Sequence, residues 1–179
     1  MLINKKNTKF LITLFCFSIF SSISQTNEDV PLNNIAINEI PKPISSLIFE
    51  DFSGNKIDLK NYQGNLVIVN FWATWCTPCK KEMPSLDNLY QNSEFKNLQI
   101  FAVNMEQPNK LKTKNFFEDL HIKKLKIFFD SNLNFLKEFK LRGVPTTVLI
   151  NKKGEEFARV IGFIDFDNKK IIKWLQKYD

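Results

Sequence analysis

The sequence predicts a single α/β domain with a mixed central sheet and helices on both of its faces. Strand-like apolar segments alternate with amphipathic helix-like segments through the middle of the chain, a hairpin-like pair precedes them, and a second hairpin and a helix end the chain. Alternating strands and helices favour parallel neighbours in a sheet, whereas hairpins add antiparallel strands. With 179 residues, 44% of them hydrophobic, the chain is long and apolar enough for one core.

Two segments of different character are expected before this domain. Residues 1–25 begin with lysines, continue with an apolar run at 10–20 and end in small serines, which is typical of an export signal. The run is shorter than the roughly 20 residues that span a bilayer, and an uncleaved N-terminal anchor is the alternative. Residues 26–45 are polar and carry prolines, which predicts a linker or irregular arm. The domain is then expected at 46–179.

The elements of the domain follow from their patterns. Residues 46–51 and 56–59 predict a hairpin around a Ser-Gly-Asn turn. Residues 66–73, LVIVNFWA, form an apolar run with one polar interruption, which predicts the central buried strand. Further strands are expected at 98–104, 125–129, 146–150 and 156–161, and helices at 78–92, 109–121, 133–140 and 167–178.

A pair of cysteines stands where the central strand gives way to a helix. Cys16 lies in the export segment, so Cys76 and Cys79 are the thiols expected in the mature domain. Two cysteines three residues apart at a helix start form a redox-active dithiol more often than an inert structural disulfide, which is the alternative. Unpaired N–H groups there favour a thiolate on Cys76, which is expected to attack while Cys79 resolves. Pro78 suits the first helical turn.

Composition argues against several other functions. His121 is the single histidine, and two thiolates alone cannot complete a four-ligand zinc site. We therefore expect no metal and no cofactor beyond the redox-active disulfide Cys76–Cys79. Of the formal charge of +6, three lysines fall within the first ten residues, and the remaining +3 is spread along the chain. This distribution does not predict nucleic-acid binding.

Two more residues are candidates for the site. Glu82 falls within the apolar arc of its helix, where a raised pKa would suit proton exchange with a thiol. The alternative is a first-turn acid that the helix dipole stabilises. Pro145 opens a strand, and an X–Pro bond is the ordinary route to a cis peptide, although the residues alone favour a plain trans turn. A cis bond would turn the Val144 backbone toward an extended substrate segment.

Residues 70–84, NFWATWCTPCKKEMP, strongly resemble the active-site segment of thioredoxin-fold proteins, and are most similar to the exported TlpA/ResA/CcmG (DsbE-like) group. Residues 144–147, VPTT, resemble the cis-proline loop of that family. Residues 48–59 resemble the N-terminal hairpin of the group, and the helix at 109–121 its inserted helix. The resemblance therefore implies a thioredoxin-like fold with an N-terminal β-hairpin and an inserted helix.

The resemblance also implies roles for individual residues. Cys76 matches the attacking cysteine, Cys79 the resolving one, and Glu82 the buried glutamate of ResA-like members. Asn70 stands where cytoplasmic thioredoxins carry a buried aspartate, which makes Glu82 the candidate for handling the proton of Cys79. The residues expected to contact substrate are Trp75, Thr77, Pro78, Val144 and the cis-proline Pro145.

The implied function is an exported thiol–disulfide oxidoreductase that acts as a monomer in the periplasm, or anchored in the inner membrane and facing the periplasm. Its expected substrates are exported thiol proteins, such as apocytochrome c or copper-assembly proteins, and its expected electron donor is a membrane protein of the DsbD/CcdA type. Two alternatives are a thiol peroxidase and a redox-inert binding or chaperone module that uses the fold alone. The sequence leaves the direction of electron flow open.

Overall fold

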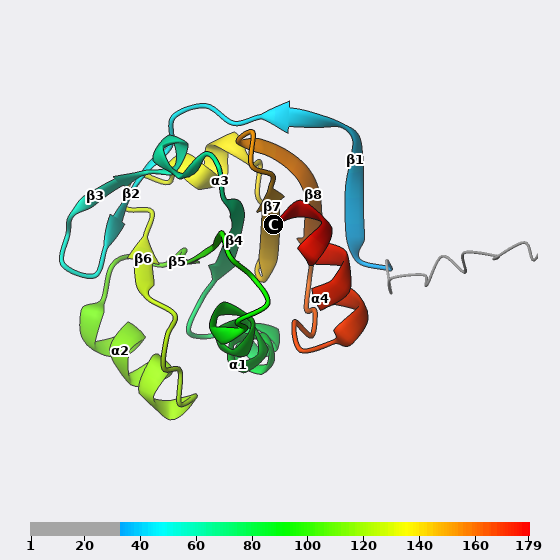
Figure 1. Ribbon diagram of the computed structural model, residues 1–179. Helices are drawn as coiled ribbons and strands as arrows, with labels where there is room; N and C mark the ends of the chain where they lie inside the picture. Colours follow the sequence, from blue (N-terminus) through cyan, green and yellow to red (C-terminus); the bar gives the residue numbers. More distant parts are fainter. Residues whose placement is uncertain (1–32) are drawn as a thin grey trace, which may run out of the picture.

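One eight-stranded mixed sheet forms the centre of the molecule (Figure 1). The computed structural model describes residues 33–179. Within that range the strands are β1 (Ile35–Pro43), β2 (Ile48–Asp51), β3 (Lys56–Asp58), β4 (Leu66–Trp72), β5 (Leu98–Asn104), β6 (Ile127–Phe129), β7 (Thr146–Ile150) and β8 (Glu155–Ile161). The α-helices are α1 (Thr77–Gln91), α2 (Lys110–Asp119), α3 (Asn134–Glu138) and α4 (Lys169–Leu175), and 3-10 turns cover Leu59–Tyr62 and Gln176–Tyr178. The strands lie in the order β1-β8-β7-β4-β5-β6-β2-β3.

Strand β4 lies near the middle of the sheet and determines what each face carries. It runs parallel to β5 and antiparallel to β7, and all seven of its residues are buried. Because successive side chains of a strand point to opposite faces, the apolar run supplies both layers of the core. Ile68 and Trp72 join one hydrophobic cluster, and Val69 and Phe71 join the other.

The helices cover the two faces unequally. Apolar side chains of α1, α2 and α4 belong to the cluster that contains Trp72. Phe135 of α3 belongs to the opposite cluster, where Phe49 packs edge-to-face against both Phe101 and Phe135. Figure 1 shows the same division, with α3 across the sheet from the other three helices. The expected α/β class with helices on both faces is confirmed.

Most expected elements are present with small shifts of their ends. The hairpin β2–β3, the central strand and β5 are confirmed, and α2 occupies the position expected for the inserted helix. The last helix is shorter than expected, because α4 ends at Leu175 and continues as a 3-10 turn.

Among residues 33–179, no helix combines the length and apolar character needed to cross a membrane.

The expectation of a linker or irregular arm over 26–45 is wrong for its described part. Strand β1 pairs antiparallel with β8, from Ile35 opposite Val160 to Pro43 opposite Glu155. β1 is an edge strand whose side chains are mostly exposed, so it lacks the apolar alternation that marks buried strands. Prolines are tolerated at an edge because a missing N–H need not break a ladder there. The export segment expected at 1–25 lies outside the described residues.

A buried carboxylate fixes the segment between α2 and β6 against α1. Asp87 accepts hydrogen bonds from the backbone N–H groups of Lys123, Lys124 and Leu125 at 3.0, 2.8 and 2.7 Å. The side chain of Gln91 donates a further bond at 3.1 Å. This one acceptor therefore satisfies three backbone donors of a connection that has no regular structure.

We predict that Asp87→Asn lowers the free energy of unfolding by about 2 kcal/mol, because the amide NH2 would face a backbone donor and leave it unsatisfied. Urea denaturation of the oxidised protein measures the change. Asp119→Asn is the matched control, since Asp119 is exposed at the end of α2 and should change stability by less than about 0.5 kcal/mol. Equal effects of the two substitutions would show that Asp87 does not hold this segment.

Candidate functional site

The two cysteines lie at the junction of β4 and α1 and form a disulfide with an S–S distance of 2.01 Å. β4 ends at Trp72, and the N–H of Cys76 donates to the carbonyl of Ala73 at 3.1 Å, which turns the chain into the helix. Cys76 is the N-cap of α1, and its Sγ accepts the N–H of Cys79 at 3.2 Å. The sequence folds this way because an apolar strand is followed directly by a helix with proline in its first turn.

The two sulfurs occupy different environments. Cys76 precedes the first turn of α1, where free N–H groups and the helix dipole favour a thiolate. Cys79 lies one turn further, is 0% exposed, and packs in the cluster that contains Met83 and Leu86. The pair is therefore asymmetric in the way that attack by the first cysteine and resolution by the second requires.

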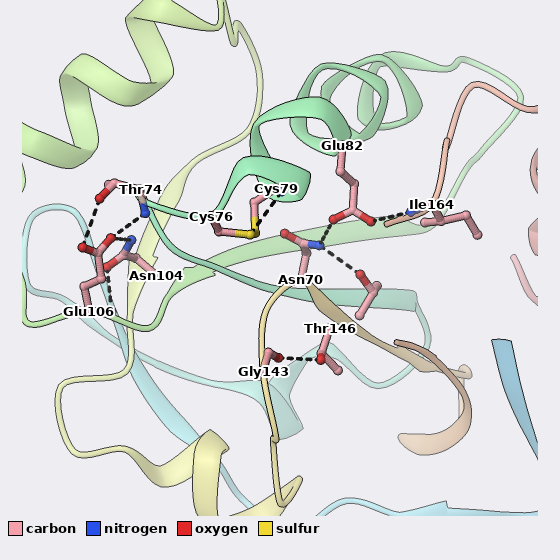
Figure 2. The surroundings of a disulfide bond; sticks show 11 residues. Asn70, Thr74, Cys76, Cys79, Glu82, Asn104, Glu106, Gly143, Thr146 and Ile164 are labelled. Carbon is pink, nitrogen blue, oxygen red and sulfur yellow. Dashed lines mark hydrogen bonds between the residues drawn. A yellow bond between two sulfur atoms is a disulfide. The ribbon is translucent and has the colours of Figure 1, made fainter. Parts of the chain in front are cut away.

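Glu82 lies on the same face of α1 as Cys79, three residues further on, and is 1% exposed. Its Oε2 accepts from Nδ2 of Asn70 at 3.0 Å, and its Oε1 accepts from the N–H of Ile164 at 3.2 Å (Figure 2). Burial raises the pKa of Glu82 to about 7, although both hydrogen bonds act in the opposite direction. A carboxyl group with this pKa exchanges protons near neutral pH.

Asn70 connects Glu82 to the sheet. It lies on β4 opposite Thr147 of β7, and its Nδ2 also donates to Oγ1 of Thr147 at 2.9 Å. Asn70 is 1% exposed, and its Oδ1 has no hydrogen-bond partner. Helix α1, strands β4 and β7 and the segment that contains Ile164 therefore meet at one buried polar group.

Three of the expected substrate-contacting residues lie on the surface around Cys76. Trp75 is 69% exposed, and Thr77 and Pro78 are exposed in the first turn of α1. Their side chains therefore border the cysteine that is expected to attack.

The loop before β7 has the cis peptide bond that the resemblance implied, between Val144 and Pro145. The plain trans turn that the residues alone favoured is wrong. Pro145 is buried, and its carbonyl accepts the N–H of Gly162 at 2.9 Å. Oγ1 of Thr146 donates to the carbonyl of Gly143 at 2.7 Å, which closes the loop (Figure 2). Because Thr146 pairs with Phe71, this loop lies at the sheet edge where β4 ends.

A cleft of about 790 Å³ opens beside this loop. Gly143, Val144 and Pro145 form part of its wall, and Ile161 and Gly162 at the end of β8 continue it. The side chain of Ile161 is 63% exposed. The cleft thus provides a partly apolar recess next to the proline loop.

Glu106 is a further site residue, and it was not among the residues that the sequence motifs singled out. Its carboxylate accepts from the N–H and Oγ1 of Thr74 at 2.5 and 3.0 Å, from Nδ2 of Asn104 at 3.3 Å, and from Nζ of Lys112 at 2.7 Å. Although partial burial acts in the opposite direction, the hydrogen bonds, with that from Lys112 the largest, lower the pKa of Glu106 to about 2. Figure 2 shows the carboxylate against the loop that leads to Cys76.

A signal for Glu106 was present in the sequence. Glu106 follows β5 by two residues, and β5 runs parallel to β4. The carboxyl ends of parallel strands meet at one sheet edge, so a polar residue just after β5 is expected near the loop after β4.

Among residues 33–179, no group of three or more His, Cys, Asp or Glu side chains is placed to hold a metal ion.

Known proteins resemble the chain over most of its length. The model of the AhpC/TSA family matches residues 40–155. Thiol-disulfide oxidoreductase ResA from Bacillus subtilis (strain 168) is 30% identical over 158 residues, which cover 87% of this chain and 83% of that protein. ResA from Bacillus anthracis is 32% identical over 124 residues, which cover 69% of this chain and 70% of that protein.

Solved structures have the same fold. StoA from Bacillus subtilis matches with a TM-score of 0.60 and 26% identity, over 79% of this chain and 98% of that one. A thiol:disulfide interchange protein of the thioredoxin family from Chlorobium tepidum TLS matches with a TM-score of 0.64 and 22% identity, over 78% and 99% of the two chains. The disulfide at the start of α1 has the position that such chemistry requires. The chain belongs to the AhpC/TSA family and is a protein thiol-disulfide oxidoreductase of the thioredoxin-fold TlpA/ResA/CcmG group.

Proposed function

We propose that the protein is an exported reductant of disulfides in a small set of partner proteins, with Cys76 as the attacking and Cys79 as the resolving cysteine. The observation that carries this proposal is the buried Glu82 one turn beyond Cys79, held through Asn70. Both cysteines are buried, but a proton acceptor three residues beyond Cys79 on the same helix face serves Cys79 rather than Cys76 at the helix start.

The reaction has two exchange steps. The thiolate of Cys76 attacks one sulfur of the partner disulfide, so that a mixed disulfide forms and the other partner sulfur leaves as a thiolate that takes up a proton. Cys79 then gives its proton to Glu82 and attacks Sγ of Cys76. The partner leaves with both sulfurs reduced, and the Cys76–Cys79 disulfide remains. A membrane electron donor of the DsbD/CcdA type restores the dithiol by the reverse exchange and is itself oxidised.

Partner recognition is assigned to the surface around the cysteines. Trp75, Thr77 and Pro78 are exposed beside Cys76, where they can contact the chain on either side of a partner disulfide. On the other side of the site, the Val144–Pro145 loop borders the cleft of about 790 Å³. A partner segment that passes the loop in an extended form would gain both polar backbone and apolar contacts.

The proposed place of this reaction is the periplasm, with the chain either free or anchored in the inner membrane. Residues 1–25 support export through their lysines and short apolar run. The proposed substrates are the haem-binding cysteines of apocytochrome c or the cysteines of a copper-assembly protein. Support comes from the similarity to the thiol-disulfide oxidoreductase ResA, and from residues 70–84, which resemble the exported TlpA/ResA/CcmG group.

A trapping experiment tests this function. In the full chain carrying Cys79→Ser, the mixed disulfide on Cys76 cannot be resolved, so partners should accumulate as disulfide-linked complexes in the cells that make the protein. Mass spectrometry identifies them, and a chain with both Cys76→Ser and Cys79→Ser is the matched control. Capture of apocytochrome c or copper-assembly proteins supports the proposal. Recovery of nothing beyond the double variant would overturn it.

We predict that Glu82→Gln lowers the pKa of Cys79 by about one unit, because the ionised carboxylate disfavours a second negative charge beside it. Ultraviolet absorbance of the thiolate measures the titration in a chain where Cys16→Ser and Cys76→Ala leave Cys79 as the single thiol. Glu118→Gln, at an exposed position on α2, is the control and should leave the titration in place. Identical Cys79 titrations with glutamate and glutamine at position 82 would remove Glu82 from the proton pathway.

The same substitution checks the Glu82 pKa in the oxidised protein. Folding raises this pKa from 4.5 to about 7, so between these pH values the folded chain holds a proton that the unfolded chain has lost. The free energy of unfolding therefore falls as pH rises through this window, by about 3 kcal/mol in total for this group. Glu82→Gln should remove that part of the slope in urea denaturation series from pH 4 to pH 8.

We predict that Glu106→Gln destabilises the loop before Cys76, because an amide NH2 must then face a donor of Thr74, Asn104 or Lys112. Loss of a carboxylate with several donors costs about 1–3 kcal/mol, and amide exchange of Thr74 should accelerate. Lys112→Met is the control, since the Lys112 side chain is 53% exposed and its ion pair with Glu106 should contribute less than about 1 kcal/mol. The proposed anchoring is wrong if Thr74 exchanges equally fast in the native protein and in Glu106→Gln.

A further inference from the structure

One buried polar atom at the site has no partner in the disulfide form of the protein. Oδ1 of Asn70 makes no hydrogen bond, while Nδ2 of the same amide makes two. With Glu82 ionised, these bonds set the orientation of the amide, since the reverse orientation would place Oδ1 against the carboxylate oxygen of Glu82. A buried carbonyl oxygen without a donor is rare in folded proteins and calls for an explanation.

The free oxygen faces the cysteines. In Figure 2 the amide nitrogen of Asn70 points toward Glu82, and the amide oxygen points toward the disulfide. The hydrogen bonds agree with this view, because Glu82 is one helical turn beyond Cys79 and Asn70 is bonded to Glu82 from the strand beneath. Cys79 is fully buried, so a thiol at this position must find its acceptor inside the protein.

We propose that Oδ1 of Asn70 accepts the S–H of Cys79 in the reduced protein, so that the Asn70 amide is a positioning residue that joins the resolving cysteine to Glu82. The dithiol of the membrane electron donor supplies two electrons and two protons, the Cys76–Cys79 bond breaks, and the donor becomes a disulfide. A disulfide has no hydrogen to donate, which explains why Oδ1 is unpartnered in the oxidised form. The inference rests on the proposed assignment of Cys79 as the resolving cysteine.

This contact stabilises one redox state only. The acceptor is unused in the disulfide form and is paired in the dithiol form, so it shifts the equilibrium toward the dithiol. In the reduced protein the amide then contacts a thiol through its oxygen and a carboxyl group through its nitrogen. Asn70 thereby holds the resting thiol of Cys79 beside Glu82, and the S–H leaves Oδ1 for the Glu82 carboxylate when the proton is transferred.

The reduction potential of the Cys76–Cys79 pair tests whether this contact stabilises the dithiol form. Asn70→Leu removes the acceptor at similar size and should lower the equilibrium constant for reduction by glutathione about tenfold, which for a two-electron couple is about 30 mV more negative. Thr147→Val is the matched control, because it removes the other partner of Nδ2 and leaves Oδ1 in place. An Asn70→Leu potential equal to that of the native protein would overturn the proposal.

Infrared spectroscopy tests the hydrogen bond itself, independently of activity and of any partner. In a full chain with Cys16→Ser and Cys76→Ala, Cys79 gives the single S–H stretching band, which hydrogen bonding moves to lower frequency. Asn70→Leu should return the band to the frequency of a free thiol. Asn70→Asp, which keeps an acceptor oxygen and loses the NH2, should leave it shifted.

The remaining outcomes each decide the matter. A band that does not respond to Asn70→Leu would assign the S–H to another acceptor and reject the inference. A band that responds to Glu82→Gln and not to Asn70→Leu would make Glu82 the direct acceptor, which also rejects it. Either result would leave the proposed reductase function intact, because that function is tested by the trapped partners of Cys76.

Discussion

The contact between Glu82 and Asn70 holds the cysteine pair in its place over the sheet. It joins α1 to β4, and Thr147 extends it to β7. The backbone of Ile164 binds the same carboxyl group, and the N–H of Phe166 donates to Oγ of Ser85 at 3.1 Å on the next turn of α1. The first half of α1 is thus tied directly to β4 and to residues 164–166, and through Asn70 to β7. The height and rotation of Cys79 above the sheet depend on these bonds.

Two carboxyl groups flank the loop between β4 and α1, and their environments give them opposite properties. Glu82 is enclosed by apolar neighbours, and burial raises its pKa to about 7. For Glu106, partial burial is outweighed by the donors of Lys112, Thr74 and Asn104, which lower its pKa to about 2. The first group can therefore exchange a proton near neutral pH, while the second stays charged and holds the loop. The opposite pKa shifts follow from the deeper burial of Glu82 and from the larger number of donors around Glu106.

The pattern of apolar residues along the sequence was enough to predict those strands and helices that bury a defined apolar face. The apolar run of β4 and the apolar arc of α1 placed Cys79 and Glu82 correctly on the buried side of the site. β1 was missed because an exposed edge strand has no alternation, and its pairing with β8 depends on residues far along the chain. Glu106 was missed for a related reason, since its partner Thr74 is 32 residues earlier and only strand pairing brings the two together.

The asparagine at position 70 and the glutamate at position 82 are best understood as a matched pair. An aspartate at position 70 would place a second carboxyl group 3.0 Å from the first in a buried site, and the two could not both ionise. One would then hold a proton across the range in which the other is needed as a base. Asparagine avoids this competition. It offers the ionised glutamate an N–H donor and keeps an oxygen free on the side of Cys79, so one neutral residue serves a carboxylate and a thiol at once.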